Sequence, residues 1–314
     1  MSLTGPPGED LDSATTFPQF IRAAAAAYGD APAISMQDET AQALSFRDLD
    51  DQSAELARAL LARGVGKGSR IGFICGNGPF FALAFAAIGR IGAVAIPIST
   101  LIKADELVRV LRQSDAAGLI VQRSLLGHDL VERLAGALPA LREASGPDLR
   151  LPRAPYLRWI ASTGDHLPPA FLDLRTLTQA AASVDDALLR EVEAEIHAED
   201  QLVEIYTSGS MALPKGVKHN HGAVMFRARY IANVTGRARG MEMTVPLPMF
   251  WVGGMGMFLL PNWWAGAHSI CTEATRTDSR TAMGSVLTDD ALAAMAGVRP
   301  YWALGMSETF GPYS

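Results

Sequence analysis

The sequence predicts an α/β protein built on parallel sheets, and three observations support this prediction. Short apolar runs alternate with helical patterns between residues 44 and 121. The runs are apolar throughout rather than at every second position, as strands buried on both faces require. Glycines such as Gly64, Gly66 and Gly68 separate the runs from the helices. This alternation is typical of parallel sheets that are covered by helices on both faces.

The elements follow in order along the chain. Ser45 and Asp48 form an approximate capping box, which predicts a helix that ends near Gly64. We expect strands at 70–75, 93–98, 117–121, 156–161, 203–206 and 244–246. We expect helices at 80–89, 104–114, 125–141, 185–196 and 221–230. The segment 251–264 is apolar but broken by three glycines and Pro261, so it is interpreted as loop and helix wall.

Composition and charge argue against several classes of function. The chain has 314 residues and 49% hydrophobic side chains, enough for one large or two ordinary globular domains. Its net charge of −6 argues against a nucleic-acid surface, which needs basic patches. Arg90 and Pro97 interrupt the most apolar stretch, so no transmembrane segment is expected. Without a signal-peptide pattern or a cysteine pair at metal-ligand spacing, a cytoplasmic location is expected.

The segment 206–216 carries the strongest chemical signal. It combines three hydroxyl side chains, two glycines and one lysine: Thr207, Ser208, Ser210, Gly209, Gly216 and Lys215. Hydroxyl groups and flexible backbone can surround phosphate oxygens, and a lysine can neutralise them. A simple Gly/Ser turn is the structural alternative. The segment is not a Walker A loop, because Lys215 precedes its glycine; a flap over phosphates is therefore expected rather than a helix N-terminus.

This segment resembles the phosphate loop of the adenylate-forming enzymes, which include acyl-CoA synthetases, luciferases and peptide-synthetase adenylation domains. The resemblance extends over 44–70 and 77–97, and 304–309 is similar to the family's Tyr-Gly-x-Thr-Glu motif. The chain departs from the family at Met211-Ala212, where Thr-Gly is usual, and at Leu304, where the family has an aromatic residue that stacks on adenine. The match identifies the chain with the large N-terminal domain of an AMP-dependent acyl-CoA synthetase of the fatty-acid–CoA ligase type.

The resemblance implies a layered αβαβα arrangement of two parallel-sheet subdomains, expected at 1–195 and 196–314. The second would be incomplete, because the family has a further helix and strand near the position of 275–281. The family also continues beyond the equivalent of residue 314 into a small C-terminal domain with a catalytic lysine. We therefore expect the chain to be part of a longer protein, and a shortened, inactive relative is the alternative.

The resemblance also implies roles for individual residues. The catalytic group would be Lys215, Ser307 and Glu308, with Glu308 also holding Mg²⁺. Contacts to ATP would come from Thr207, Ser208, Gly209, Ser210, Gly216, Gly284, Leu304, Gly305 and Met306. The acyl pocket would be lined by His219, Phe250, Trp251, Gly253 and Gly254, with the glycines leaving room for a ligand. Core packing of the aromatic residues, and structural roles for His219 and His221, are the alternatives.

The implied reaction joins a carboxylic acid, expected to be fatty, to ATP as an acyl-adenylate and then transfers the acyl group to coenzyme A. Two other readings stay open at this point. One is an acyl-AMP ligase that loads a carrier protein, and the other is a non-catalytic module that binds a nucleotide or an acyl group. The sequence also leaves open the acyl chain length and the oligomeric state, including a homodimer.

Overall fold

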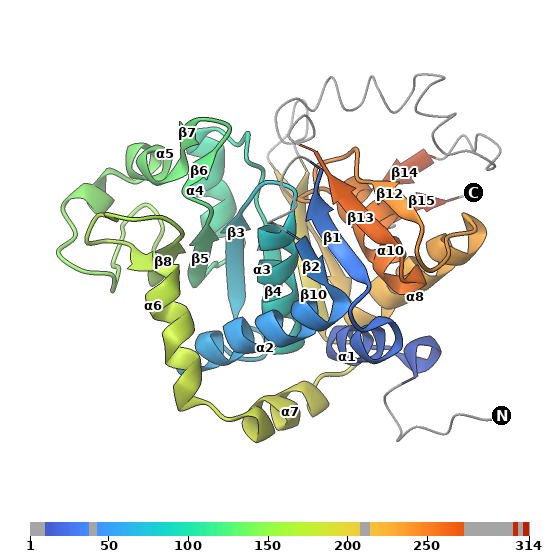
Figure 1. The fold of residues 1–314 in the computed structure, drawn as a ribbon. Helices are drawn as coiled ribbons and strands as arrows, with labels where there is room; N and C mark the ends of the chain where they lie inside the picture. The colour runs from blue at the N-terminus through green and yellow to red at the C-terminus, as the bar shows by residue number, and fades with distance from the viewer. Residues whose placement is uncertain (1–9, 38–42, 208–213, 273–303, 307–309, 314) are drawn as a thin grey trace.

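The computed structural model describes residues 10–37, 43–207, 214–272, 304–306 and 310–313. Within these residues the chain forms two larger sheets with helices between and beside them (Figure 1). The α/β class expected from the sequence is confirmed. No helix among the described residues is both long enough and apolar enough to cross a membrane.

The larger sheet has seven strands in the described part of the chain, in the order β11-β10-β4-β3-β5-β8-β9. Their bounds are β3 Arg70–Ile74, β4 Val94–Pro97, β5 Gly118–Val121, β8 Trp159–Ser162, β9 Leu172–Asp173, β10 Gln201–Thr207 and β11 Lys215–Asn220. All neighbours are parallel except β10 and β11. The six parallel strands therefore end at one edge of the sheet, called here the carboxyl edge, and begin at the opposite, amino edge.

The smaller sheet has the order β12-β13-β1-β2 among the described residues. Its strands are β1 Pro32–Met36, β2 Ala43–Ser45, β12 Glu242–Thr244 and β13 His268–Cys271. Strands β12, β13 and β1 are parallel, and β2 is antiparallel to β1. Each sheet is thus mainly parallel, as expected, and has one antiparallel strand at one end. A short connection allows only antiparallel pairing, since a parallel return needs a long crossover.

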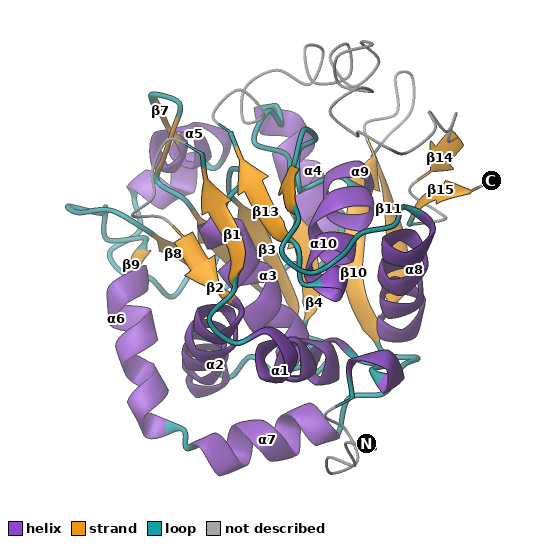
Figure 2. Ribbon diagram, turned by 45° about the vertical axis from the view of Figure 1, so that its right-hand side comes forward, coloured by secondary structure: helices purple, strands orange, loops and turns teal. Residues whose placement is uncertain are grey.

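Helices separate the two sheets. Helix α2 (Phe46–Ala62) begins at the capping box predicted from Ser45 and Asp48, in which each side chain accepts from the other residue's backbone N–H. Both α2 and α3 (Pro79–Arg90) contact strands of the smaller sheet, and they share one buried apolar cluster with both sheets. Helices α4 (Ala104–Gln113) and α5 (Leu130–Ala137) cover the other face of the larger sheet with a second cluster (Figure 2).

The remaining helices frame these layers. They are α1 Phe17–Tyr28, α6 Leu174–Gln179, α7 Asp186–Ala194, α8 His221–Val234, α9 Val252–Gly254 and α10 Leu260–Ala265. A buried ion network joins α2, α3 and α7. The guanidinium of Arg90 is fully buried and lies 2.6 Å from Glu193 and 2.8 Å from Asp50. A buried charge is tolerated only when it is paired in this way.

Two predicted elements differ from the structure. The helix expected over 125–141 is shortened to α5, because β6 (Ser124–Leu125) and β7 (His128–Asp129) form a small hairpin before it. Leu126 and Gly127 adopt positive φ in the turn, as a two-residue hairpin of this kind requires. The segment 251–264 is helical rather than partly loop: α9, a π-helical turn over Met255–Leu259 and α10 follow one another.

The sheets exchange strands across the predicted boundary between residues 195 and 196. Strand β10, from the second predicted subdomain, pairs with β4 of the first. Strand β1, from the beginning of the chain, pairs with β13 near residue 270. The boundary itself stays a prediction, but neither larger sheet is formed from one side of it alone.

Candidate functional site

The predicted phosphate loop connects β10 and β11 at the carboxyl edge of the larger sheet. Thr207 lies opposite Lys215, and Tyr206 lies opposite Gly216, in the antiparallel register of these strands. Lys215 is exposed. The predicted Ser208, Gly209 and Ser210 lie outside the described residues. Ligands of open α/β sheets bind at the carboxyl ends of the strands, so Thr207 and Lys215 flank a turn at a favourable position.

Strand β11 was not predicted. The sequence suggested a flexible flap and then a helix from His221. The helix α8 does begin at His221, but Lys215–Asn220 form a strand before it. Its residues are mostly polar, and it lies at the end of the sheet, where only one neighbour is present. An end strand with few apolar residues gives little periodic signal.

The buried carboxylate of Glu204 connects this hairpin to the rest of the larger sheet. Glu204 of β10 accepts hydrogen bonds from the Arg70 guanidinium at 3.0 Å and from the Tyr206 hydroxyl at 2.7 Å. Burial and the neighbouring carboxylate raise the pKa of Tyr206 above its usual range. Burying an ionised carboxylate requires such partners. The network therefore connects the middle of β10 to the start of β3, two strands away in the sheet.

Gly216 is enclosed by this network. A Cβ atom at Gly216 would lie 2.2 Å from Glu204 Oε1 and 3.0 Å from the Tyr206 ring. Only glycine fits there without displacing the carboxylate. The position was predicted for contact with ATP, and the structure adds a packing reason for the glycine. Its contact with a nucleotide stays a prediction.

The described residues of the second predicted motif belong to a short hairpin that contacts β11. Leu304, Gly305 and Met306 form β14 (Leu304–Met306), which pairs with β15 (Gly311–Tyr313). Between them, the buried Phe310 packs edge-to-face against His219 of β11, with 4.9 Å between ring centroids. The Phe310 carbonyl also lies 2.9 Å from where a Cβ on Gly256 would be. The predicted Ser307, Glu308 and Gly284 lie outside the described residues.

The predicted acyl-pocket segment is held by Asn77, which follows β3. Its Nδ2 donates to the Leu247 carbonyl at 2.9 Å, and its Oδ1 accepts from the Met249 N–H at 2.8 Å. Phe250 is buried, and Trp251 packs edge-on against it and is partly exposed. These contacts bring the chain after β12 close to the carboxyl end of β3.

The glycines of this segment do not open free space in the structure. A Cβ at Gly253 would lie 2.8 Å from Leu247 Cδ1, and one at Gly254 would lie 2.2 Å from the Pro248 carbonyl oxygen. The segment before α9 folds back against the helix and takes the room expected for a ligand. A pocket role for Gly253, Gly254, Phe250 and Trp251 therefore stays a prediction, without support from the space beside the two glycines.

The two histidines have structural surroundings. His219 is buried against Phe310. His221 is fully buried, and its Nδ1 accepts from the Phe17 N–H at 3.0 Å, joining α8 to α1. Burial lowers the pKa of His221 to about 4, so the ring is neutral at pH 7 and suited to accept. The part of the chain that the structure describes contains no group of three or more His, Cys, Asp or Glu side chains that could hold a metal.

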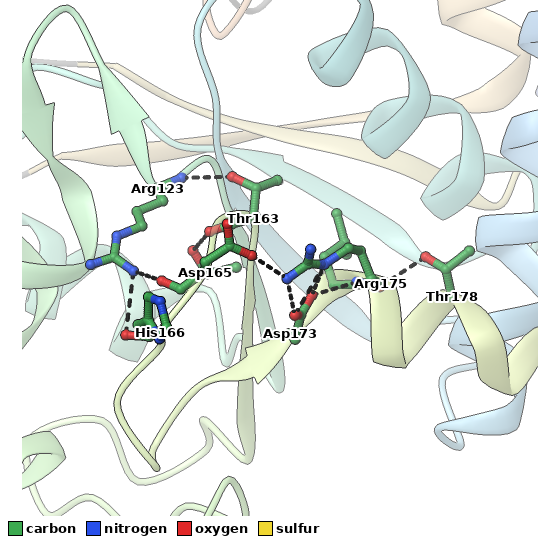
Figure 3. A network of polar contacts seen from close by, with 9 residues as sticks. Arg123, Thr163, Asp165, His166, Asp173, Arg175 and Thr178 are labelled. Atoms are coloured by element: carbon green, nitrogen blue, oxygen red, sulfur yellow. Dashed lines mark hydrogen bonds and ion pairs between the residues drawn. The ribbon is translucent and has the colours of Figure 1, made fainter.

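The other end of the carboxyl edge is closed by ion pairs, shown in Figure 3. The Arg175 guanidinium lies 2.6 Å from Asp165 and 2.7 Å from Asp173, and these carboxylates raise its pKa. The Arg123 guanidinium pairs with Asp129 at 3.3 Å and donates to the Asp165 carbonyl. Both cations are already paired with carboxylates, so this end is poorly suited to bind an anion.

Sequence reasoning missed three residues that shape the site: Glu204, Phe310 and Asn77. Glu204 is the one charge within the apolar run 202–205, which is an available signal because an acid in a buried strand needs a partner. Asn77 follows a predicted strand at the edge where ligand sites form. Phe310 lies just past the second motif and has no signal of its own.

Comparisons with known proteins agree with this arrangement. Two curated relatives are the putative acyl-CoA synthetase YngI of Bacillus subtilis, 29% identical over 75% of this chain, and the long-chain-fatty-acid–CoA ligase FadD13 of Mycobacterium tuberculosis, 27% identical over 68%. The chain spans 43% and 36% of their lengths. A crystal structure of the anthranilate CoA ligase AuaEII with anthranoyl-AMP is similar in fold, with a TM-score of 0.67 and 22% identity, over 81% of this chain and 44% of that one.

The sequence profile of the AMP-binding enzymes matches residues 21–309, which include both predicted motifs and nearly the whole described fold. Because it covers most of the chain, this match establishes that the chain belongs to the AMP-binding enzyme family.

Proposed function

We propose that this protein is an AMP-forming acid–thiol ligase that activates a carboxylic acid with ATP and transfers the acyl group to coenzyme A. The observation that most supports this is that residues next to both motifs lie on or against one strand, β11. Thr207 and Lys215 flank the turn between β10 and β11, and Phe310, two residues after Glu308, packs against His219 of β11. A phosphate-binding turn beside an acidic residue suits the alignment of two anions.

In this proposal the chain acts mainly through charge and alignment. The hydroxyl groups of Thr207, Ser208 and Ser210 donate to phosphate oxygens, and Lys215 neutralises them. The substrate carboxylate attacks the α-phosphorus, and the bond to pyrophosphate breaks. The sulfur of coenzyme A then bonds to the acyl carbon, AMP leaves with the electron pair, and the thiol proton passes to solvent. Ser307 donates to the α-phosphate as charge develops there.

We further propose that Mg²⁺ accompanies ATP and that Glu308 holds it. Mg²⁺ is commonly bound by one or two carboxylates together with phosphate oxygens, so a cluster of three protein ligands is not required. Bound there, Mg²⁺ would neutralise phosphate charge. Cys75 and Cys271 are both buried and are the only two cysteines of the sequence. So low a cysteine content suits a reducing compartment, and we propose that the protein acts in the cytoplasm.

The acid is proposed to be fatty rather than aromatic. The support is the apolar character of the segment that includes Phe250 and Trp251. The relatives themselves leave the acid open, because one is named for long-chain fatty acids and the similar solved structure for anthranilate.

The test is acid-dependent exchange of labelled pyrophosphate into ATP by the full-length protein. The panel contains aliphatic acids of increasing length, benzoate and anthranilate, each with and without Mg²⁺. We expect exchange with the aliphatic acids that stops when Mg²⁺ is chelated. Exchange only with the aromatic acids would overturn the fatty substrate, and no exchange with any acid would overturn the ligase for this panel.

A second assay identifies the acceptor. Coenzyme A and a carrier protein with a phosphopantetheine thiol are supplied in separate reactions with the best acid. Release of acyl-CoA is the expected result. Acylation of the carrier protein alone would favour the acyl-AMP ligase instead.

A further inference from the structure

A cavity of about 520 Å³ opens at the amino edge of the larger sheet, on the side opposite the phosphate-loop turn. Its floor includes residues at the beginnings of three parallel strands: Ser69 and Ile71 at β3, Ala117 before β5, and Trp159 at β8. These strands lie side by side (Figure 1). The volume falls in the range of small-molecule sites.

Three arginines from separate segments line this cavity. Arg63 follows α2, Arg150 lies in the loop before β8, and Arg158 directly precedes β8. One carboxylate, Asp148, also lines it and pairs with Arg63 at 2.7 Å. The cavity wall therefore carries more positive than negative charge, although the whole chain has a net charge of −6.

Arg150 and Arg158 keep most of their hydrogen-bonding capacity. Arg150 donates to the Leu149 carbonyl at 2.8 Å, and Arg158 donates to the Pro155 carbonyl at 2.6 Å. Among the residues that the structure describes, neither has a carboxylate within ion-pair distance. A guanidinium has five N–H donors, and its planar fork matches the oxygens of a phosphate. Two such groups beside one cavity are suited to bind a phosphate.

The rest of the wall is apolar. Val65 and Ile71 line the cavity, and Trp159 is held across β5 with its ring over Gly118, where a Cβ would lie 2.1 Å from the indole. Ile71 is fully buried, and Val65 and Trp159 are 5% and 4% exposed, so a bare phosphate would leave only a narrow apolar strip in contact with water. An organic body attached to the phosphate would cover it, at a gain of about 25 cal/mol for each Å² of apolar surface removed from water.

We propose that this cavity is a binding site for a small phosphorylated metabolite, distinct from the ATP site at the carboxyl edge. The phosphate contacts Arg150 and Arg158, and a small organic part lies against the exposed strip of Val65 and Trp159. The two sites occupy opposite edges of the same sheet, because β10, which leads to the phosphate-loop turn, runs parallel to β4 and β3.

The test uses phenyl phosphate as the probe, measured by titration calorimetry on the full-length protein. The variant is the double substitution Arg150→Gln and Arg158→Gln. The matched control is Arg142→Gln with Arg153→Gln, which removes the same charge from the segment between α5 and β8, at side chains that do not line the cavity. We expect saturable binding that weakens at least roughly tenfold in the first variant and less than about twofold in the control.

Three further comparisons make the outcome decisive. Lys215→Ala is expected to leave the affinity for phenyl phosphate unchanged, whereas loss in this variant would place the probe in the ATP site and overturn the proposal. Equal weakening of phenyl phosphate binding in both double variants would show that only the overall charge of the protein matters, and this would also overturn the proposal. Orthophosphate is expected to bind more weakly than phenyl phosphate, and equal affinities would refute the organic part of the ligand. All of these results are independent of ligase activity.

Discussion

At the carboxyl edge of the larger sheet, Arg123 and Arg175 are paired with carboxylates. At the amino edge, Arg150 and Arg158 face a cavity and have only carbonyl partners among the described residues. Near β4 the amino edge differs again, because Arg90 is buried there and paired with Asp50 and Glu193. The same residue type thus closes one region, stabilises a second and leaves a third open to an anion. The partners of each arginine, rather than the presence of an arginine, decide which of these three roles it has.

The largest effect on stability is expected from Arg90→Met. The change leaves the buried carboxylate of Glu193 with one fewer partner, and breaking a buried ion pair costs about 3–5 kcal/mol. Urea denaturation would measure the loss in free energy of unfolding. As a control, Arg175→Gln removes an exposed guanidinium with exposed partners and should not change the midpoint measurably. Similar losses in the two variants would contradict the distinction between buried and exposed pairs.

Lys215→Ala tests whether the turn at the carboxyl edge handles phosphate. We expect the rate of acid-dependent pyrophosphate exchange to fall about 10²–10³-fold, as when a group that stabilises developing charge is removed. Thermal melting should be unchanged, because the Lys215 side chain is exposed. Lys218→Ala, on the same strand and also exposed, is the control and should keep its activity. An active Lys215→Ala enzyme would refute the role of this lysine.

His221 predicts a pH dependence at the amino end of β10. Its folded-state pKa of about 4 lies below the ordinary value near 6.5, so its contribution is complete above pH 6.5 and is lost as the pH falls toward 4. The loss is on the order of 3 kcal/mol at most. Unfolding free energies at pH 7.5 and 5 would be compared for the wild type and His221→Gln. A variant with the same pH dependence as the wild type would rule out His221 as its source.

Gly216→Ala is expected to destabilise the β10–β11 hairpin by about 1–3 kcal/mol, because the new methyl group would overlap the Glu204 carboxylate. Gly136→Ala is the matched control. No atom lies within 4 Å of a Cβ there, and alanine favours the helix α5, so stability should hold or rise. Unfolding in urea measures both, and a neutral Gly216→Ala would show that Glu204 can move away.

The strands and helices of the region 44–121 could be predicted because their signals are local. The capping box at Ser45 and the apolar runs of β3, β4 and β5 depend on neighbours within a few residues. Strand β11 could not be predicted in the same way, because it has no apolar pattern and is held in the sheet by its pairing with β10. The hairpin at Leu126 and Gly127 was hidden inside an apolar run that also fits a helix.

The candidate site divides in a similar way. The motif around Thr207 and Lys215 was recognisable from residue types and order alone. The contacts that hold it were not, because Arg70 and Glu204 meet over 134 positions of sequence separation. The space around Gly253 and Gly254 was predicted to be open and is filled by Leu247 and Pro248. The sequence shows that a glycine has no side chain, but it does not show which neighbouring residue occupies the space beside it.

The pairing of β1 with β13 also has a consequence for how the chain matures during synthesis. The Trp263 indole donates to the Ala33 carbonyl, a contact between residues 230 positions apart. While the ribosome is still adding those residues, β1 has only β2 beside it in the smaller sheet, and its other edge stays available to foreign strands. The larger sheet from β3 to β9 is translated well before β13. Completion of the smaller sheet is therefore a late event, and slowing translation after residue 207 would prolong the exposure of β1.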